Sequence, residues 1–368
     1  QNSQGTPETI HCSDCKSARL IKAKGSFGPA PAPESPCRIN ELGTNPANSL
    51  YWFEQEHHTV WYRFKAEKTG RMTFTIIPRD SNDDYDFLLF KYTGGNLCED
   101  VINKKIKPIR TNISRNDKTI NSKTGLALTA EDKYVHSGPG KSFSMAVNVT
   151  RGERFYLVLD NVYENGKGHL ISFHYYEYYV ISGKVTDEKG DALPTKAEVM
   201  WEDQRSGKLL AKTSASAQTG EYKLNAPVEI DRPGKKYNLS VVPREKYFFK
   251  DTTIQGDDLK KKKKINILTK LRRLFKGRKY TISNIYFYGN SPVVLPKSKA
   301  TLKKLYEIMK NNKTMKIRIE GHTNGVGTFN SASYHQELSD NRAKTVYRYL
   351  LNRDISPGRI SSVGYGCS

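Results

Sequence analysis

The spacing of apolar residues changes once along the chain, and this change constrains the fold more than any other feature. Between Val60 and Ile76 apolar and polar residues alternate with a break at Gly70, which predicts a strand, a turn and a second strand. Further along, two stripes of apolar residues recur at intervals of three and four, namely Leu302, Leu305, Ile308 and Met309, then Ala343, Val346, Tyr347 and Leu350. The chain therefore begins as an all-β protein and ends with helices.

The alternating part falls into two blocks. Strand-like runs separated by long polar stretches predict an all-β sandwich of jelly-roll type over residues 51–178. Shorter strands with turn residues between them predict a second, smaller β-sandwich over residues 179–257. Residues 1–50 contain clusters of proline and no sustained period, which predicts an irregular segment.

Length and composition support a multidomain, globular protein. A chain of 368 residues has room for two or three domains, and 36% hydrophobic residues suffice for buried cores. No run approaches the roughly 20 uninterrupted apolar residues of a membrane-spanning helix. The sequence also lacks the Gly-x-Ser-x-Gly, His-Glu-x-x-His and Walker motifs, so we expect neither enzymatic activity nor a cofactor.

Four of the five cysteines stand in the first hundred residues. Only one pair has the CxxC spacing, and no histidines stand at finger spacing, which disfavours zinc. Bridged cysteines that pin a Pro-containing segment are typical of exported proteins, and three pairings remain open. The disulfide candidates are Cys12, Cys15, Cys37 and Cys98. Gln rather than Met stands first, as expected of a chain trimmed of its secretory signal and equally of a trimmed fragment.

Residues 258–279 form a basic linker. Eleven Lys and Arg residues and no acid lie between Lys260 and Lys279, which is half of the net charge of +22. On a helix, Leu268, Leu271 and Phe275 would share a face, a pattern typical of docking on an anionic membrane surface. The alternative is a solvated linker whose few apolar residues pack on a neighbouring domain, and runs of like charge favour this second interpretation.

Residues 280–368 are expected to form an α+β domain, with strands at Ile285–Phe287 and Lys316–Glu320, each followed by one of the two helices. In order and spacing, four motifs resemble the OmpA-like C-terminal domain: ISNIYFYGNSPVVLPKSKATLKKL, KIRIEGHTNGVGT, ELSDNRAKTVYRYLLNRDISPGRI and SVGYG. This resemblance implies non-covalent binding of peptidoglycan through the diaminopimelate of its stem peptide.

A diaminopimelate side chain ends in one carbon that bears both an ammonium and a carboxylate. A selective pocket therefore needs an acceptor for the first and a guanidinium for the second. Arg342, expected at the start of the second helix, supplies the two-pronged donor, and helix N-terminal amides near Ser339 and Asp340 are expected to add donors. The expected peptidoglycan-binding residues are His322, Thr323, Asn324, His335, Leu338, Ser339, Asp340 and Arg342.

Two positions depart from the family pattern. Asn324 stands where the family has Asp after Gly-His-Thr, and His335 stands where it has Asn. A hydrogen bond to a charged group contributes roughly 1.5–3 kcal/mol and a neutral one roughly 0.5–1.5, so Asn324 would hold an ammonium more weakly or prefer another ligand. A domain that keeps the fold but serves as a protein interaction surface is the alternative. The family continues with another strand beyond Gly366, so we expect the native polypeptide to continue.

Two further resemblances concern the β blocks. Residues 180–256, with SGKVTDEKGDALPTKAEV, TGEYKL and KKYNLSVV, resemble the carboxypeptidase regulatory-like module, which carries no peptidase site. Residues 51–177, with TVWYRFKAEKTGRMTFTI and DDYDFLLF, resemble prepeptidase-like jelly-roll domains of exported proteins. This domain order resembles periplasmic components of Bacteroidota, including those linked to type IX secretion and gliding.

An acidic loop, RDSNDDYDFLLF, enters one of the predicted strands. Its oxygen donors are candidate calcium ligands, with Asp160 as a further donor. The residues concerned are Asp80, Asp83, Asp84 and Asp86. The EF-hand pattern is absent, and a solvated loop with a cap at the strand entry is the favoured alternative.

Together these patterns predict a non-catalytic protein of the periplasm, associated with the outer membrane and peptidoglycan. We expect the C-terminal domain to bind peptidoglycan and the N-terminal β domains to contact an outer-membrane or periplasmic protein complex. The alternative is binding of a polyanion or a membrane surface through Lys260–Lys279, with the OmpA-like domain as a protein interaction module. Nucleic acid is not an expected partner.

Overall fold

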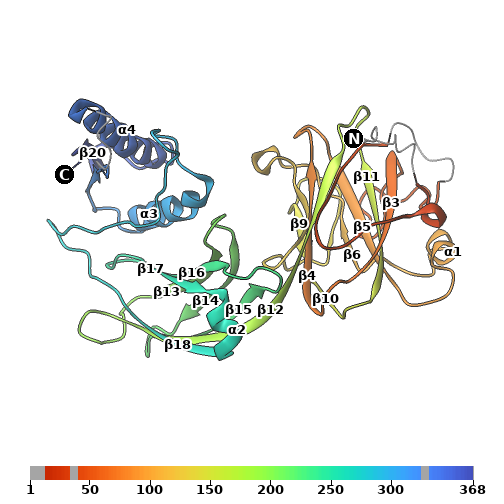
Figure 1. Ribbon diagram of the computed structural model, residues 1–368, viewed down its shortest axis with the longest axis horizontal. Helices are drawn as coiled ribbons and strands as arrows, with labels where there is room; N and C mark the ends of the chain where they lie inside the picture. Colours follow the sequence, from red (N-terminus) through yellow and green to blue (C-terminus); the bar gives the residue numbers. More distant parts are fainter. Residues whose placement is uncertain (1–12, 34–39, 325–330, 368) are drawn as a thin grey trace, which may run out of the picture. The chain divides into compact units, whose positions relative to one another are not determined.

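The computed structural model describes residues 13–33, 40–324 and 331–367, which are mostly β-sheet with a few helices (Figure 1). The chain forms two compact units. Unit 1 consists of Gln1–Glu177 and Glu229–Asp231, and unit 2 consists of Tyr178–Val228 and Arg232–Ser368. The finer division into domains stays a prediction.

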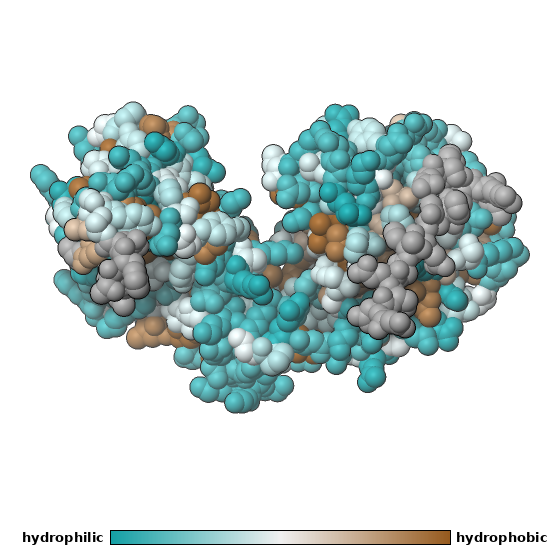
Figure 2. Space-filling view, turned by 45° about the horizontal axis from the view of Figure 1, so that its top comes forward, coloured by the Kyte–Doolittle hydropathy of each residue, from teal (hydrophilic) through white to brown (hydrophobic). Residues whose placement is uncertain are grey.

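The described surface is mainly polar. On the face shown in Figure 2, hydrophilic residues dominate and apolar residues form small separate patches. Among the helices that the structure describes, none has the length and apolar character needed to cross a membrane.

Unit 1 is built from two β-sheets. The first has the order β1-β3-β11-β5-β6-β8, with bounds Arg19–Leu20, His58–Lys65, Arg154–Asn161, Tyr85–Tyr92, Arg110–Asn112 and Tyr134–Val135. The second contains β2, β4, β7, β9, β10 and the first half of β12, with bounds Gly25–Ala30, Gly70–Pro78, Thr124–Ala127, Phe143–Met145, Val147–Val149 and His169–Thr186. The predicted strands on either side of Gly70 are confirmed as β3 and β4, but they lie in different sheets.

Both faces of the first sheet are covered by apolar side chains. Val60 of β3 packs into a core with residues of β4 and β12, whereas its neighbour Trp61 packs into a second core. Adjacent residues of a strand point to opposite faces, so the second core lies on the outer side of the sheet. Leu42, Trp52 and Phe53 from the N-terminal part cover that side, together with α1 (Leu97–Ile102).

A disulfide joins Cys15 to Cys98, with 5.6 Å between the Cα atoms. It links the short 3₁₀ helix Cys15–Ser17 to α1, and both cysteines belong to the outer core. Cys12 and Cys37 lie outside the described residues. The disulfide therefore attaches the segment that covers the sheet to the rest of unit 1.

Unit 2 begins with the second half of β12, which pairs with the parallel strand β18 (Lys264–Lys270) and neighbours β15 (Glu221–Glu229). A separate sheet has the order β14-β13-β16-β17, with bounds Leu209–Ala215, Ala197–Asp203, Lys236–Pro243 and Lys250–Gln255. Within the unit, Trp201 is fully buried and stacks on Tyr237 at 4.8 Å between ring centroids.

The amphipathic helix considered as the less favoured interpretation of the basic linker is not found. Helix α2 (Gly256–Lys262) ends before Leu268, Leu271 and Phe275, and β18 follows at once. Leu271 is 1% exposed, whereas Leu268 and Phe275 are 59% and 56% exposed. Pairing with β12 imposes a two-residue period on β18, so these three residues do not share a face.

The last part of unit 2 contains two long helices and a parallel strand pair. The predicted stripes are confirmed in α3 (Lys299–Asn311) and α4 (Ala332–Leu351), which pack on β19 (Ile317–Gly321) and β20 (Ile360–Gly364). The strand predicted at Ile285–Phe287 is wrong, because among the described residues Phe287 forms only an isolated bridge with Val294. Short 3₁₀ turns, Pro296–Ser298 and Pro357–Arg359, precede α3 and β20.

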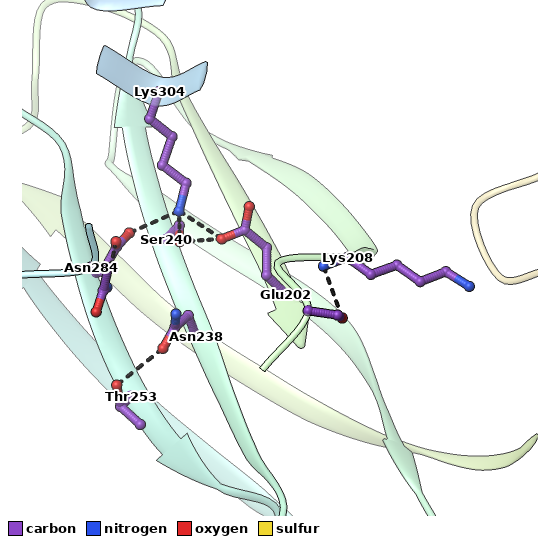
Figure 3. A network of polar contacts seen from close by, with 9 residues as sticks. Glu202, Lys208, Asn238, Ser240, Thr253, Asn284 and Lys304 are labelled. Atoms are coloured by element: carbon purple, nitrogen blue, oxygen red, sulfur yellow. Dashed lines mark hydrogen bonds and ion pairs between the residues drawn. The ribbon is translucent and has the colours of Figure 1, made fainter. Parts of the chain in front are cut away.

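A buried ammonium fixes α3 on the four-stranded sheet (Figure 3). Nζ of Lys304, a residue only 3% exposed, donates to Glu202 at 2.6 Å, to Ser240 at 2.6 Å and to Asp251 at 3.1 Å. Oγ of Ser240 donates to Glu202 at 2.9 Å, and Asn284 donates to the second oxygen of Asp251 at 2.8 Å. The helix therefore cannot leave the sheet without exposing or isolating buried charges.

Candidate functional site

Arg342, in the middle of α4, is held by a turn formed by residues 287–294. Its Nε donates to the carbonyl oxygen of Ser291 at 3.2 Å, and Nη2 donates to that of Tyr288 at 3.5 Å. The guanidinium lies 5.1 Å from the ring centroid of Phe287, and partial burial lowers its pKa from the ordinary arginine value. A guanidinium has five N–H donors. Three of those on Arg342 have no recorded partner among the described residues, so the group is oriented and still able to bind.

A second group of predicted residues lies where the chain leaves β19 and β20. Oγ1 of Thr323 donates to the carbonyl of Gly366 at 2.9 Å and lies 3.2 Å from Nδ1 of His335. Oγ of Ser339 accepts from the amide of Gly366 at 2.9 Å. The ring of His322 stacks on Tyr365, with 5.5 Å between centroids. These contacts order the loops after both strands against α4.

The carboxylate of Asp340 also forms hydrogen bonds in this region. Its Oδ1 accepts from the amide of Gly364 at 2.5 Å, and its Oδ2 accepts from Nε2 of Gln336 at 3.2 Å. The hydrogen bond from Gly364 is the main cause that lowers the pKa of this carboxyl below its usual value. The carboxylate is therefore ionised and keeps lone pairs that could accept from a ligand.

The expectation of helix N-terminal amides near Ser339 and Asp340 is wrong. Helix α4 begins at Ala332, where the side chain of Ser331 accepts from the amide of Tyr334. The amides of Ser339 and Asp340 therefore lie in the helix interior, where they donate to carbonyls of the preceding turn.

The structure thus divides the predicted residues into two sets. Thr323, His335, Ser339 and Asp340 are joined through residues 364–367, while Arg342 is joined to the turn of residues 287–294. Leu338 is buried in α4, and Asn324 is exposed at the end of the described part of its loop. No contact between Arg342 and Asn324 is recorded in the described residues.

Sequence reasoning missed two apolar residues beside Arg342. Tyr288 and Val293, which are 49% and 56% exposed, are paired in the turn by a hydrogen bond from the Tyr288 amide to the Val293 carbonyl at 2.9 Å. Large apolar side chains that are exposed next to each other form an apolar patch, and such patches often mark a binding site. The strand predicted at Ile285–Phe287 gave no indication that the side chains of Tyr288 and Val293 stay exposed.

Comparison with known proteins identifies this part of unit 2. Residues 286–368 match the model of the OmpA family. A peptidoglycan-associated lipoprotein of Buchnera aphidicola is 30% identical over 136 residues, which is 37% of this chain and 73% of that protein. Through its C-terminal domain, the chain belongs to the OmpA family.

An outer-membrane porin matches over a smaller part of its own length. Outer membrane porin F of Pseudomonas aeruginosa is 39% identical over 84 residues, and this chain spans 23% of that porin. A solved structure of an outer membrane protein from Borrelia burgdorferi is 29% identical and has a TM-score of 0.21, covering 23% of this chain and 73% of that one. The porin and the lipoprotein are outer-membrane or peptidoglycan-associated envelope proteins, and a periplasmic location near the outer membrane agrees with them.

The candidate calcium ligands in unit 1 do not converge. In the described part of the chain, no three His, Cys, Asp or Glu side chains are placed to hold a metal ion. Asp80 accepts from the amide and side chain of Asn82, and Asp83 accepts from the amide of Lys167. Asp84 and Asp86 are buried, and burial raises the pKa of both carboxyls.

Asp160, the further calcium candidate, has a different role. It lies opposite Asp86 in the pairing of β11 with β5 and accepts from Nδ1 of His57 at 2.8 Å. Its other oxygen accepts from the amides of His57 and His58 at 2.9 and 2.8 Å. This carboxylate therefore anchors the entry to β3 rather than a cation.

Proposed function

We propose that this chain is a non-catalytic envelope protein that binds peptidoglycan through its OmpA-family domain and tethers an outer-membrane assembly to the cell wall. The observation that carries the proposal is the orientation of Arg342. Two of its donors are held by the carbonyls of Tyr288 and Ser291, and the guanidinium has no recorded carboxylate partner among the described residues. An oriented, unpaired guanidinium is what recognition of a ligand carboxylate requires.

The ligand carboxylate is proposed to be that of the diaminopimelate centre. Nη1 and the remaining N–H of Nη2 provide a two-pronged donor of the right shape for it. The aliphatic part of the stem peptide would lie against Tyr288 and Val293, whose exposed surface would then be covered. Asn324 is the proposed acceptor for the ammonium.

A sacculus pull-down with soluble diaminopimelate as competitor tests the carboxylate contact. We expect Arg342→Ala to weaken retention at least tenfold, because a charge-assisted hydrogen bond contributes about 1.5–3 kcal/mol. Arg348→Ala is the matched control, since Arg348 is an exposed arginine of the same helix. Equal retention of wild type and Arg342→Ala would exclude this pocket.

Replacing Asn324, which departs from the family pattern, tests the ammonium contact. Asn324→Asp adds a charge with little change in volume, so calorimetry with a diaminopimelate-containing stem peptide should show up to about tenfold tighter binding. A smaller gain is expected if Asp340 already neutralises the ammonium. Failure of both proteins to bind would leave protein contact as the function of the domain.

The partner of the β-rich remainder is the finer part of the proposal. We propose that unit 1 contacts an outer-membrane or periplasmic protein complex, of the kind linked to type IX secretion and gliding in Bacteroidota, and that the module at residues 179–257 acts as a spacer. The support is the domain order alone. A photo-crosslinker in place of exposed Tyr163 in the full chain should capture envelope proteins of such a complex. Capture of none would remove this part of the proposal.

A further inference from the structure

One face of the β15-β12-β18 sheet in unit 2 carries lysines brought together from three distant parts of the sequence. Along β18 exposed residues alternate with less exposed ones, and the exposed set is Lys264, Asn266, Leu268 and Lys270. The register pairs Lys184 of β12 with Leu268, and Lys184 is exposed as well. Lys223 is exposed on the neighbouring strand β15. We call the surface formed by Lys184, Lys223, Lys264, Leu268 and Lys270 the basic face.

The lysines of the basic face are held outward by the fold. The alternate residues Ile181, Gly183 and Val185 of β12 are buried, and so is Tyr222 of β15. At Gly183 a Cβ would come within 2.1 Å of the Ile267 carbonyl and 2.6 Å of the Tyr222 hydroxyl, so that side of the sheet is closely packed. Because successive strand residues point to opposite faces, the lysines project away from this packed side.

The four lysines lack a recorded acidic partner in the described part of the chain. No ion pair is recorded for Lys184, Lys223, Lys264 or Lys270 among the described residues. In β15, β18 and the unit 2 part of β12, which begins at Tyr178, Glu221 is the one acidic side chain at an exposed position. By contrast, Arg278 farther along the linker binds Glu188 at 2.6 Å, and Lys279 binds Glu320 at 3.0 Å.

The charge continues at both ends of β18. Lys261 and Lys262 are exposed in the last turn of α2, and Arg273 and Lys276 are exposed after the strand. Phe275 is also exposed in this second group. An exposed leucine at the centre of the lysines and an exposed phenylalanine beside more cations make a surface that is both cationic and locally apolar.

We propose that the basic face docks on a bilayer surface with anionic headgroups, with its lysines at the level of the phosphates and Leu268 entering the interface. Several lysines on one side of a rigid element add their attraction to an anionic membrane surface. The short apolar contact gives a bilayer an advantage over a soluble polyanion. The docking surface is separate from the Arg342 site and does not depend on the proposed function.

Vesicle co-sedimentation of the full chain tests the proposal. Phosphatidylcholine vesicles with about one third phosphatidylglycerol should bind the protein at low salt, and pure phosphatidylcholine vesicles should not. Binding should fall steeply toward about 0.5 M salt, where screening shortens the Debye length to a few Å. The double variant Lys264→Glu/Lys270→Glu should bind at least tenfold more weakly, and Leu268→Ser several-fold more weakly.

The matched control is Lys105→Glu/Lys133→Glu, which makes the same change in net charge at exposed lysines of unit 1. It should bind anionic vesicles within about twofold of wild type, because charges that lie farther than a Debye length from the bilayer are largely screened. Arg342→Ala should also bind vesicles normally, which separates this result from the peptidoglycan assay. Circular dichroism confirms that each variant is folded before its binding is compared.

Three results would overturn the proposal. The first is equal weakening by the control pair, which would mean that net charge alone drives binding. The second is duplex DNA binding as tight as vesicle binding with no effect of Leu268→Ser, which would point to a soluble polyanion. The third is unchanged vesicle binding with new self-association of Lys264→Glu/Lys270→Glu, which would mean that these lysines protect the edge of β18 from pairing.

Discussion

In unit 1 the buried ionisable groups are mainly carboxyls, whereas in unit 2 the most deeply buried cation, Lys304, lies between two carboxylates. Asp86 and Asp160 oppose each other across two strands, and burial raises the pKa of Asp86 well above its usual value. Glu202 and Asp251 instead both accept from one ammonium. Unit 1 therefore keeps buried acids by protonating some of them, and unit 2 keeps buried acids by pairing them.

The lysines of unit 2 extend this comparison. Lys304 is enclosed and paired, while Lys264 and Lys270 are exposed without recorded partners among the described residues. A lysine side chain thus stabilises the fold at position 304, whereas at positions 264 and 270 it is available for binding. The four predictions below test this division, from the largest effect to the smallest.

Removing the buried ammonium should have the largest effect. Lys304→Ala leaves Glu202 and Asp251 buried without their cation, which typically costs about 3–5 kcal/mol. Hydrogen exchange measured by mass spectrometry should show faster exchange across α3, β13 and β16. Peptides of unit 1 provide the internal reference, and Lys303→Ala, at an exposed position of α3, should change nothing. Unchanged exchange in Lys304→Ala would show that the cluster does not hold α3 on the sheet.

Unit 1 should depend on its disulfide in a way that unit 2 does not. Cys15→Ala/Cys98→Ala should destabilise unit 1 by about 2–5 kcal/mol, because the bridge constrains the unfolded chain and attaches the segment over the outer core. Fluorescence of Trp52 and Trp61 in a Trp201→Phe background reports on unit 1 alone. Coincident melting curves for the variant and its background protein would contradict this expectation.

The two units should respond differently to pH. Burial raises the pKa of Glu41 and of Glu56 to about 7, and the hydrogen bond to Asp160 raises that of His57 above 6.5. Groups with raised folded pKa values stabilise fully below their unfolded pKa and lose this contribution as pH rises through the folded value. Stability from the two glutamates should therefore fall between about pH 4.5 and 7.

His169 acts in the opposite direction, because burial lowers its pKa to about 3, so its contribution is lost as pH falls from about 6.5. The stability gained at low pH from the two glutamates exceeds the stability lost from the one histidine. Unit 1 should therefore melt about 3–6 °C higher at pH 5.5 than at pH 8. The tryptophan signal of the Trp201→Phe background measures this difference. Glu41→Gln/Glu56→Gln should remove most of it, and an unchanged difference in that variant would contradict the assignment.

Exposed lysines should contribute least to stability. Lys264→Gln should change the free energy of unfolding of unit 2 by less than about 0.5 kcal/mol, because an exposed side chain without a partner leaves nothing unpaired when it is replaced. Denaturant unfolding followed by Trp201 fluorescence makes the comparison with Lys304→Gln in the same unit. A loss as large as that of Lys304→Gln would break the distinction between paired and exposed lysines.

Several elements were predictable because their signals are local. The stripe Leu302, Leu305 and Ile308 has the helical period, and α3 is found there. The start of α4 was placed too late, since its first turns from Ala332 to Glu337 are mostly polar and the buried residues begin only at Leu338. The N-cap at Ser331 was the signal that would have located it.

Other elements were not predictable because their partners are distant in sequence. Strand β18 lies in a lysine-rich stretch, and what makes it a strand is its pairing with β12, about eighty positions upstream. A strand was predicted at Ile285–Phe287, at the start of the turn that holds Arg342, because an apolar run of three residues does not reveal whether it pairs with another strand. The pocket residues of the OmpA-like motifs were named from the sequence, but the division of these residues between two loops was not.

The sequence by itself determined the order of β-rich and helical parts, the membership of the OmpA family and the excess of positive charge, because periodicity, motif and composition are properties of short stretches. Tertiary structure alone decided which lysine is buried against carboxylates and which lysines gather on one sheet face. Lys304 and Lys264 are chemically identical, and only the packing of α3 on one sheet and of β18 beside β12 determines whether each ammonium loses its water or keeps it.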